Sequence, residues 1–276
     1  GIAPAMAGLV SRTPGLRVVS YPVLFVTALV FNCSRPPFDD VRVRIAIDAL
    51  VDRQRIVDVA LGGYGEAATG PVRSDHPWFW RQQRPGRDRA LALLDEAGWR
   101  LGRDGWRRKG DRELAFTLLS VGSGDNAIEQ LLQADLRAAG IKMDIRLAEL
   151  GAFLAIARGN PKRFDAVLAG IPGDLALSYL VAMFDGRHAG GALDYAGFHT
   201  PELDRAFARV RSSLTPAEEA NAWAGVQETL AAQLPASWIY HATGVQGVAA
   251  SLSGVRMDLR GELVSLAEWE RRGVQR

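Results

Sequence analysis

The segment Phe31-Asn-Cys-Ser-Arg-Pro-Pro-Phe-Asp-Asp-Val-Arg-Val-Arg-Ile-Ala-Ile-Asp-Ala-Leu50 changes character at its paired proline. Residues 23–31 before it are apolar, β-branched and aromatic, which is typical of a buried strand. After it, apolar residues recur at helical spacing, and Asp39 or Asp40 can cap the helix. The paired proline is therefore predicted to stiffen the junction between a strand and a helix.

Strands and helices alternate beyond this segment. Thr215-Pro-Ala-Glu218 is a capping box that predicts the start of one helix. This order predicts an α/β architecture with a mixed sheet flanked by helices. The further predicted elements are helices near 90–97, 126–139, 152–158 and 177–184, strands at 141–147, 164–170 and 238–240, and a hairpin within 105–119 with a Lys-Gly-Asp turn.

Composition excludes several classes of protein. The chain has 276 residues, of which 48% are hydrophobic and 23% charged, as in ordinary globular proteins. Its 33 basic and 31 acidic residues are spread evenly, so no basic face for nucleic acid or a membrane is predicted. The single cysteine, Cys33, excludes an internal disulfide and is predicted to be a small buried side chain.

No targeting or spanning segment is predicted. Gly1-Ile-Ala-Pro-Ala-Met6 does not have the charged and apolar regions of a signal peptide. The longest apolar run, at about 18–31, is interrupted by Ser20, Pro22 and Thr27 and is too short to cross a membrane as a helix. The abrupt start at Gly1 suggests that the chain is a fragment of a longer protein.

The two ends of the chain are expected to form one body. The segment 244–276 is too short for a domain of its own, so it is predicted to pair with the strand at 18–31. The chain would then cross between two bodies near 34–37 and near 241–244, an arrangement that suits a hinge. The predicted division is 1–36 for the first lobe, 37–240 for the second lobe, and 241–276 for the return to the first.

Several motifs resemble the family 5 extracellular solute-binding proteins, which are the capture subunits of ABC importers. The resemblance extends in order over nearly the whole chain. It is carried by Phe31-Asn32, Pro36-Pro37-Phe38, Asp40-Val-Arg-Val-Arg44, Ala46, Asp52-Arg53, Ile56-Val57, Gly62-Gly63, Gly70-Pro71, Leu93-Leu-Asp-Glu-Ala-Gly-Trp99, Asp104-Gly105, Gly140-Ile141, Phe164-Asp165 and Pro201-Glu-Leu-Asp204.

This resemblance implies a fold and a function. Family members have two lobes, so the chain is expected to be a lobe of the type II periplasmic-binding-protein class with some strands of the other lobe. The implied function is capture of a small solute, a peptide first and a nickel or other metal complex second, by hinge closure and delivery to a membrane permease. The full-length protein would be a periplasmic or extracellular monomer, associated with the membrane through the permease or a lipid anchor that lies outside this chain. It would have no cofactor and perform no catalysis.

The resemblance also suggests a ligand site. The segment Ala169-Gly170-Ile171-Pro172 and Asp174 match the family's cleft-lining strand and turn, with Ile171 where many relatives have tryptophan. The aspartate at this position in peptide binders pairs with the ligand's amino terminus. Asp174 can equally cap the helix at 177–184, in which Tyr179 is also assigned to the predicted site.

Three further residues complete the predicted site. His188 lies near where nickel binders have a loop histidine, although no second ligand stands nearby and a solvated loop residue explains it as well. Trp78 and Trp80 are assigned to the site because, with His76 and Phe79, they could form the floor of a pocket; equally, these side chains could pack their loop onto the lobe. Two other functions remain open: a hydrolase using Asp174, Ser178 and His188, and an interaction module that buries the cleft face.

Overall fold

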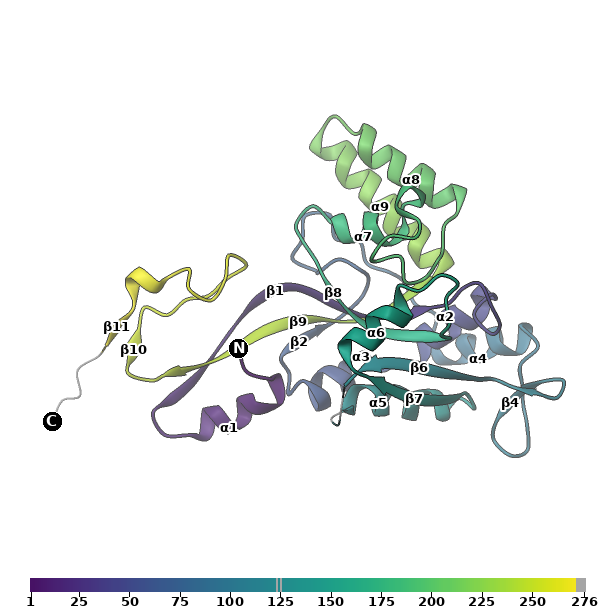
Figure 1. The fold of residues 1–276 in the computed structure, drawn as a ribbon, viewed down its shortest axis with the longest axis horizontal. Helices are drawn as coiled ribbons and strands as arrows, with labels where there is room; N and C mark the ends of the chain where they lie inside the picture. Colours follow the sequence, from purple (N-terminus) through teal and green to yellow (C-terminus); the bar gives the residue numbers. More distant parts are fainter. Residues whose placement is uncertain (123, 125, 272–276) are drawn as a thin grey trace.

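The computed structural model describes residues 1–122, 124 and 126–271 and is built on one mixed sheet (Figure 1). The order of its six strands is β2-β9-β1-β8-β6-β7. Strands β6, β7 and β8 are parallel, whereas β1 runs antiparallel to both of its neighbours, β8 and β9. The strands are β1 (Leu16–Phe31), β2 (Gly65–Ala67), β6 (Ala115–Val121), β7 (Lys142–Ala148), β8 (Ala166–Pro172) and β9 (Ala236–Ala249).

Helices cover both faces of the sheet, which confirms the predicted α/β class. Strand β1 shows why its sequence is continuously apolar: Leu29 and Phe31 face one core, whereas Ala28 and Val30 face the other. The first core is covered by α2 (Val41–Leu50), α4 (Arg87–Glu96) and α5 (Ala127–Arg137), and the second by α6 (Leu150–Ala157), α7 (Ser178–Phe184), α8 (Pro201–Ser212) and α9 (Pro216–Gln233).

The two predicted helix caps are present. The Asp40 side chain accepts a hydrogen bond from the Arg42 N–H at 2.9 Å, so α2 begins as predicted. Thr215 and Glu218 form the capping box of α9. At the other end of α9, the buried Arg44 donates to the carbonyls of Gln233 and Leu234, at 3.1 and 3.0 Å, which satisfies acceptors that a helix end leaves free. After α2 the chain forms a single helical turn, α3 (Arg53–Arg55), continued by the wider turns of η2 (Ile56–Ala60).

The predicted hairpin differs from the structure in its second strand. Strands β4 (Arg107–Lys109) and β5 (Arg112–Glu113) form the hairpin and join β3 (Arg100–Leu101) in a small separate sheet. The chain changes partner at Leu114, whose N–H donates to the Arg107 carbonyl and whose carbonyl accepts from the Lys142 N–H. The predicted long strand is therefore divided into β5 and β6.

A long antiparallel ribbon carries the two ends of the chain away from the body. Strands β1 and β9 pair from Leu16 with Ala249 to Val30 with Ala236, which confirms the predicted partner of the last segment. We call residues 1–22 and 243–271 the arm, which lies on the left in Figure 1. The arm also contains η1 (Pro4–Met6), α1 (Ala7–Arg12), β10 (Leu252–Ser253), η4 (Leu266–Glu268) and β11 (Glu270–Arg271).

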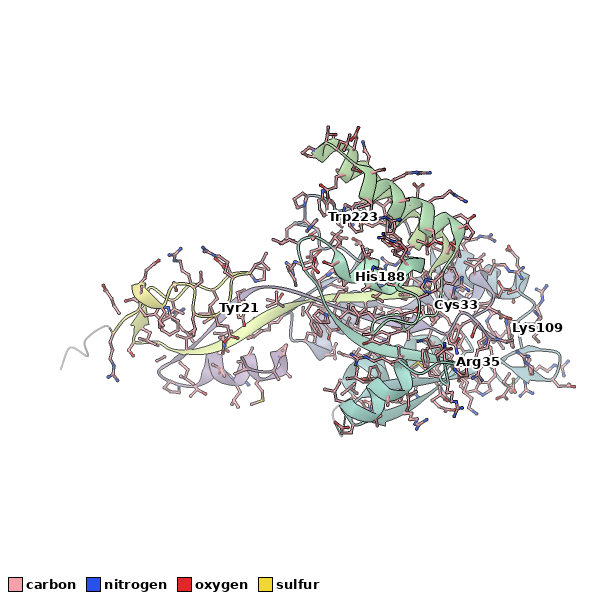
Figure 2. All side chains as sticks on the ribbon, turned by 45° about the horizontal axis from the view of Figure 1, so that its top comes forward. Tyr21, Cys33, Arg35, Lys109, His188 and Trp223 are labelled. Atoms are coloured by element: carbon pink, nitrogen blue, oxygen red, sulfur yellow. The ribbon has the colours of Figure 1, made fainter. Side chains whose placement is uncertain are left out.

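The boundary between the arm and the rest of the described chain, which we call the body, lies within β1 and not after this strand. Residues 26–31 are hydrogen-bonded to β8 on one side and β9 on the other, so they belong to the large sheet. The register with β9 shifts between Pro22 and Val26. Figure 2 places Tyr21 on the arm and Cys33 at the opposite end of β1. The first crossing between lobes stays a prediction. The break in pairing at Pro22, which cannot donate to a ladder, makes Pro22–Val26 an alternative to the predicted 34–37.

Cys33 is half-buried just after β1. Its Sγ lies 3.6 Å from the Phe31 carbonyl, and burial raises the pKa of the thiol to about 11. The thiol is thus protonated and unreactive at neutral pH. In the part of the chain that the structure describes, no helix is long and apolar enough to cross a membrane.

Candidate functional site

A hollow of about 110 Å³ lies where the arm meets the body. Five segments line it: the irregular part of β1, the loop after β2, the turn after β8 with the start of α7, β9 at His241, and the arm. Its lining residues are Leu24, Phe25, Val26, Pro71, Val72, Arg73, Asp75, His76, Pro77, Gly173, Asp174, Leu175, Leu177, Tyr179, His241 and Leu259.

Asp174 lies in the wall of this hollow and also organises the turn before α7. Its Oδ1 accepts from the backbone N–H groups of Ala176 and Ser178, at 2.8 and 3.1 Å. Its Oδ2 accepts no hydrogen bond from any residue that the structure describes. The turn role and the ligand role predicted for Asp174 are thus compatible, because Oδ1 stabilises the turn and Oδ2 is available to a ligand.

Tyr179 contributes a buried wall. Its hydroxyl donates to the Pro71 carbonyl at 2.7 Å, which joins α7 to the loop after β2. Burial raises the pKa of Tyr179 above its ordinary value, so the phenol stays neutral. This side chain therefore offers a ligand its ring and not a charge.

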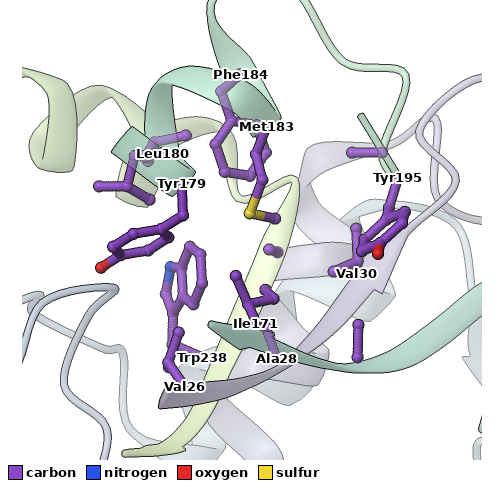
Figure 3. Close-up of a cluster of buried hydrophobic side chains, with 14 of the residues drawn as sticks. Val26, Ala28, Val30, Ile171, Tyr179, Leu180, Met183, Phe184, Tyr195 and Trp238 are labelled. Atoms are coloured by element: carbon purple, nitrogen blue, oxygen red, sulfur yellow. The ribbon is translucent and has the colours of Figure 1, made fainter. Parts of the chain in front are cut away.

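The four predicted residues of β8 do not line the hollow. Figure 3 shows Ile171 within the core, beside Ala28 and below α7, and Ala169 is equally buried. Gly170 is exposed, and the Phe25 ring occupies the space in which a Cβ at residue 170 would lie. Pro172 pairs with Phe25 in the register of β1 and β8. Their contribution is to position the neighbouring Phe25 and Asp174, and direct ligand contact by these residues stays a prediction.

Trp78, Trp80 and His188 also lie outside the hollow. Trp78 stacks on Trp223 of α9 with ring centroids 5.6 Å apart, so it packs its loop onto the body. Trp80 is half-buried, and His188, which is labelled in Figure 2, is exposed in η3 (Gly186–His188). Among the described residues, no group of three or more potential metal ligands is present.

His76, one of the aromatic residues expected either at the floor of a pocket or packed onto the lobe, lines the hollow. Its Nδ1 accepts from the Trp78 N–H at 3.1 Å, and its Nε2 lies 3.1 Å from the Leu175 carbonyl. A histidine that accepts at Nδ1 can donate at Nε2, so the ring bridges the loop after β2 and the turn after β8. The aromatic cluster around it was noticed in the sequence, but its partner, Leu175, lies 99 residues away.

The charges at the rim leave Asp174 as the carboxylate without a cationic partner. Arg73 donates to Asp75 at 3.2 Å and to the Ala242 carbonyl at 3.2 Å, and lies 3.8 Å from Glu66. Arg73 is therefore compensated within the loop. The described lining of the hollow offers a ligand one free carboxylate oxygen above apolar walls.

His241 of β9 closes the bottom of the hollow. Its Nε2 lies 3.2 Å from the Gly70 carbonyl, and its strand neighbours are Val26 and Glu66. Burial lowers the pKa of His241 to about 4, with Arg73 acting in the same direction and Glu66 against it. The imidazole is thus neutral at neutral pH.

This lowered pKa predicts a loss of stability in acid. Because the folded state disfavours the charged imidazole, the stabilisation is complete above the ordinary pKa of 6.5 and is lost as the pH falls towards 4. The expected decrease in the free energy of unfolding is about 3 kcal/mol. Urea unfolding between pH 7 and 4 measures how the free energy of unfolding depends on pH. This dependence should be weaker for His241→Asn than for the parental protein, whereas the control His188→Asn, which changes an exposed residue, should keep the parental dependence. The same pH dependence in all three proteins would contradict this assignment.

Sequence comparison identifies the family. A profile described as "Bacterial extracellular solute-binding proteins, family 5 Middle" matches residues 1–190. The chain belongs to this family, as its motifs indicated. It is 32% identical over 267 residues to Protein XP55 of Streptomyces lividans, covering 94% of this chain and 48% of that protein. It is 23% identical to the oligopeptide-binding protein AppA of Bacillus subtilis, covering 92% of this chain and 48% of AppA.

Solved structures agree on the fold. AppA of Bacillus subtilis in complex with a nonapeptide has a TM-score of 0.80 at 21% identity, covering 98% of this chain and 55% of AppA. NikZ of Campylobacter jejuni in complex with Ni(L-His) has a TM-score of 0.80 at 19% identity, covering 98% and 56%. The fold is thus that of the family's type II binding proteins. The chain spans about half the length of the curated relatives it matches.

Proposed function

We propose that this chain is the second lobe of the substrate-binding subunit of an ABC importer. It captures a small solute, most favourably a peptide, and presents it to a membrane permease. The protein acts in the periplasm or outside the cell, as a monomer, without a cofactor and without catalysis. Its family membership supports this function, and several of its relatives are named as oligopeptide-, dipeptide- or glutathione-binding proteins.

One observation favours a peptide among the possible solutes. Asp174 keeps one carboxylate oxygen free in the wall of the hollow, while the cation of the rim, Arg73, is already compensated. An ammonium group enclosed in a cleft needs such an acceptor, because a charge-assisted hydrogen bond replaces its lost hydration. A peptide amino terminus supplies that group.

Closure would occur at the two crossings between arm and body. We place them at Pro22–Val26 and at His241–Thr243, where β1 and β9 lose register. The arm then belongs to the first lobe, and the ligand contacts both lobes through residues such as Leu259 and Asp174. A ligand held by both sides stabilises the closed state over the open one.

Native mass spectrometry of the protein purified from its own host, without refolding, tests this function. We expect a bound peptide, and we expect Asp174→Asn to abolish its retention, whereas the exposed Asp58→Asn should not. A bound nickel complex would support the second candidate, for which the likeness of the fold to NikZ is the motivation. Recovery of the protein without any bound solute would count against the peptide assignment.

A hydrolase is the less favoured function. Ser178 contacts Asp174 through its backbone N–H and not through its hydroxyl, and His188 lies outside the hollow. No turnover of short peptides or esters is expected, and saturable hydrolysis that His188→Ala removes would support an enzyme instead.

A further inference from the structure

Phe25 is a large side chain whose position depends on a glycine. A Cβ placed on Gly170 would lie 2.4 Å from Cζ and 2.7 Å from Cε1 of Phe25, much closer than two such carbon atoms can approach. The ring therefore occupies the space that a side chain at residue 170 would need. This position of the Phe25 ring therefore requires a glycine at residue 170, and we call the contact between them the seat of Phe25.

The Phe25 ring is at the same time a wall of the hollow. It is 39% exposed although it belongs to an apolar strand, and it lies in the stretch of β1 that has no partner in β9. On the side of β8, Phe25 pairs with Pro172. The seat on Gly170 and this pairing hold the ring where it limits the width of the hollow.

The size of the hollow distinguishes between side chains. Its volume is about 110 Å³, whereas an apolar cavity of about 150 Å³ is known to hold a benzene molecule. Three of the lining side chains, Val26, Val72 and Leu177, are apolar and buried. A branched aliphatic group fits this volume, whereas an aromatic ring would have to displace Phe25 or extend out of the open side of the hollow.

We infer that the hollow selects ligands in which an aliphatic side chain stands next to a primary ammonium, and that Phe25, seated on Gly170, sets the upper limit on the size of that side chain. The inference rests on the proposed function, because the ammonium is assigned to the free oxygen of Asp174. It adds the class of residue that such a peptide has at its amino terminus, for which leucine and valine fit and phenylalanine and tryptophan do not.

Two small amines test this inference without a known ligand. Isoamylamine presents the side chain of leucine beside an ammonium, and phenethylamine presents that of phenylalanine. In NMR titrations of the 276-residue chain at millimolar amine, we expect isoamylamine to shift the methyl signals of Val26, Val72 and Leu177, with phenethylamine binding about tenfold more weakly. The uncharged 3-methylbutan-1-ol should bind more weakly than isoamylamine, and Asp174→Asn should remove that difference.

Two variants locate the size limit. Phe25→Ala widens the hollow and should shift the preference by about tenfold towards phenethylamine. Gly170→Ala displaces the ring and should weaken isoamylamine binding. The matched controls are Phe79→Ala, whose ring faces Arg81 outside the hollow, and Gly225→Ala, where a Cβ would meet nothing within 4 Å. Both controls should keep the parental preference, and circular dichroism checks that each variant is folded.

The possible results separate the inference from the proposed function. Absence of shifts at the hollow with either amine, a parental preference for phenethylamine, or an unchanged preference in Phe25→Ala would each overturn the inference. If peptides are retained by the purified protein while any of these results is found, the function stands and the size limit is wrong. If the preference is as expected but the retained solute has no ammonium, the size limit stands and the peptide assignment fails.

Discussion

Replacement of Asp48 by alanine is expected to lower the free energy of unfolding by about 3–5 kcal/mol. Asp48 is 1% exposed and lies on α2, where its Oδ1 accepts from Arg53 and from the Ser237 hydroxyl. Its Oδ2 accepts from Arg84 at 2.9 Å and from Gln82 at 3.1 Å. Alanine would leave two guanidinium groups without their carboxylate, one of them fully enclosed.

The pKa of Arg53 shows that burial disfavours its charged guanidinium group. Burial lowers this pKa to about 10, although Asp48 acts in the opposite direction. Removal of the carboxylate would leave this cation hydrogen-bonded to carbonyl and hydroxyl oxygens, which include the Trp238 carbonyl and the Ser237 hydroxyl. Urea unfolding at pH 7 measures the effect. Asp58→Ala, which removes an exposed carboxylate bonded to Gln54, is the control and should change stability by less than about 0.5 kcal/mol.

The second large effect is expected at Trp223 of α9. Its side chain is 2% exposed, stacks on Trp78 and meets Phe207 edge to face, with ring centroids 6.3 Å apart. Trp223→Ala should lower the free energy of unfolding by about 3–5 kcal/mol, since it removes a large volume from the core. It should also release the loop that carries Trp78, which faster hydrogen exchange of the Trp78 amide would show.

The variant Trp223→Phe separates packing from hydrogen bonding. The Nε1 of Trp223 is buried and has no hydrogen-bond partner among the described residues. Phenylalanine therefore loses volume but no hydrogen bond, and a decrease of only about 1–2 kcal/mol is expected. If Trp223→Phe were as destabilising as Trp223→Ala, an unseen hydrogen bond of Nε1 would have to be assumed and the packing account would be wrong.

The sequence predicted those parts of the fold that depend on neighbours along the chain. The apolar run of β1 indicated burial on both faces, and the caps at Asp40 and Thr215 located two helices, because these signals lie within a few residues. The hydrogen-bond network of Asp48 could not be predicted from the sequence. Its partners Gln82 and Ser237 lie 34 and 189 residues away, and nothing local distinguishes Asp48 from a surface residue of α2.

Local sequence signals indicated only some of the residues that line the hollow. Asp174 and Tyr179, two of the predicted site residues, line the hollow, and both lie in the turn and helix that follow a recognisable strand. Their contact with a ligand stays a prediction. Phe25 was missed because a phenylalanine within an apolar run has the pattern of a core residue. Pro22 was the available signal: a proline inside a predicted strand indicates broken pairing, and a side chain next to the break can become exposed.

The pairing of β1 with β9 also has a consequence for the order of folding. Strand β1 lies in the middle of the sheet, yet Val30 meets its partner Ala236 only after about 200 further residues have been added. At a synthesis rate of about 5–20 residues per second, the ribosome needs about 10–40 s for that length of chain. During this time one edge of this apolar strand stays open, so the nascent chain presents an unpaired segment to chaperones long before the native sheet can form.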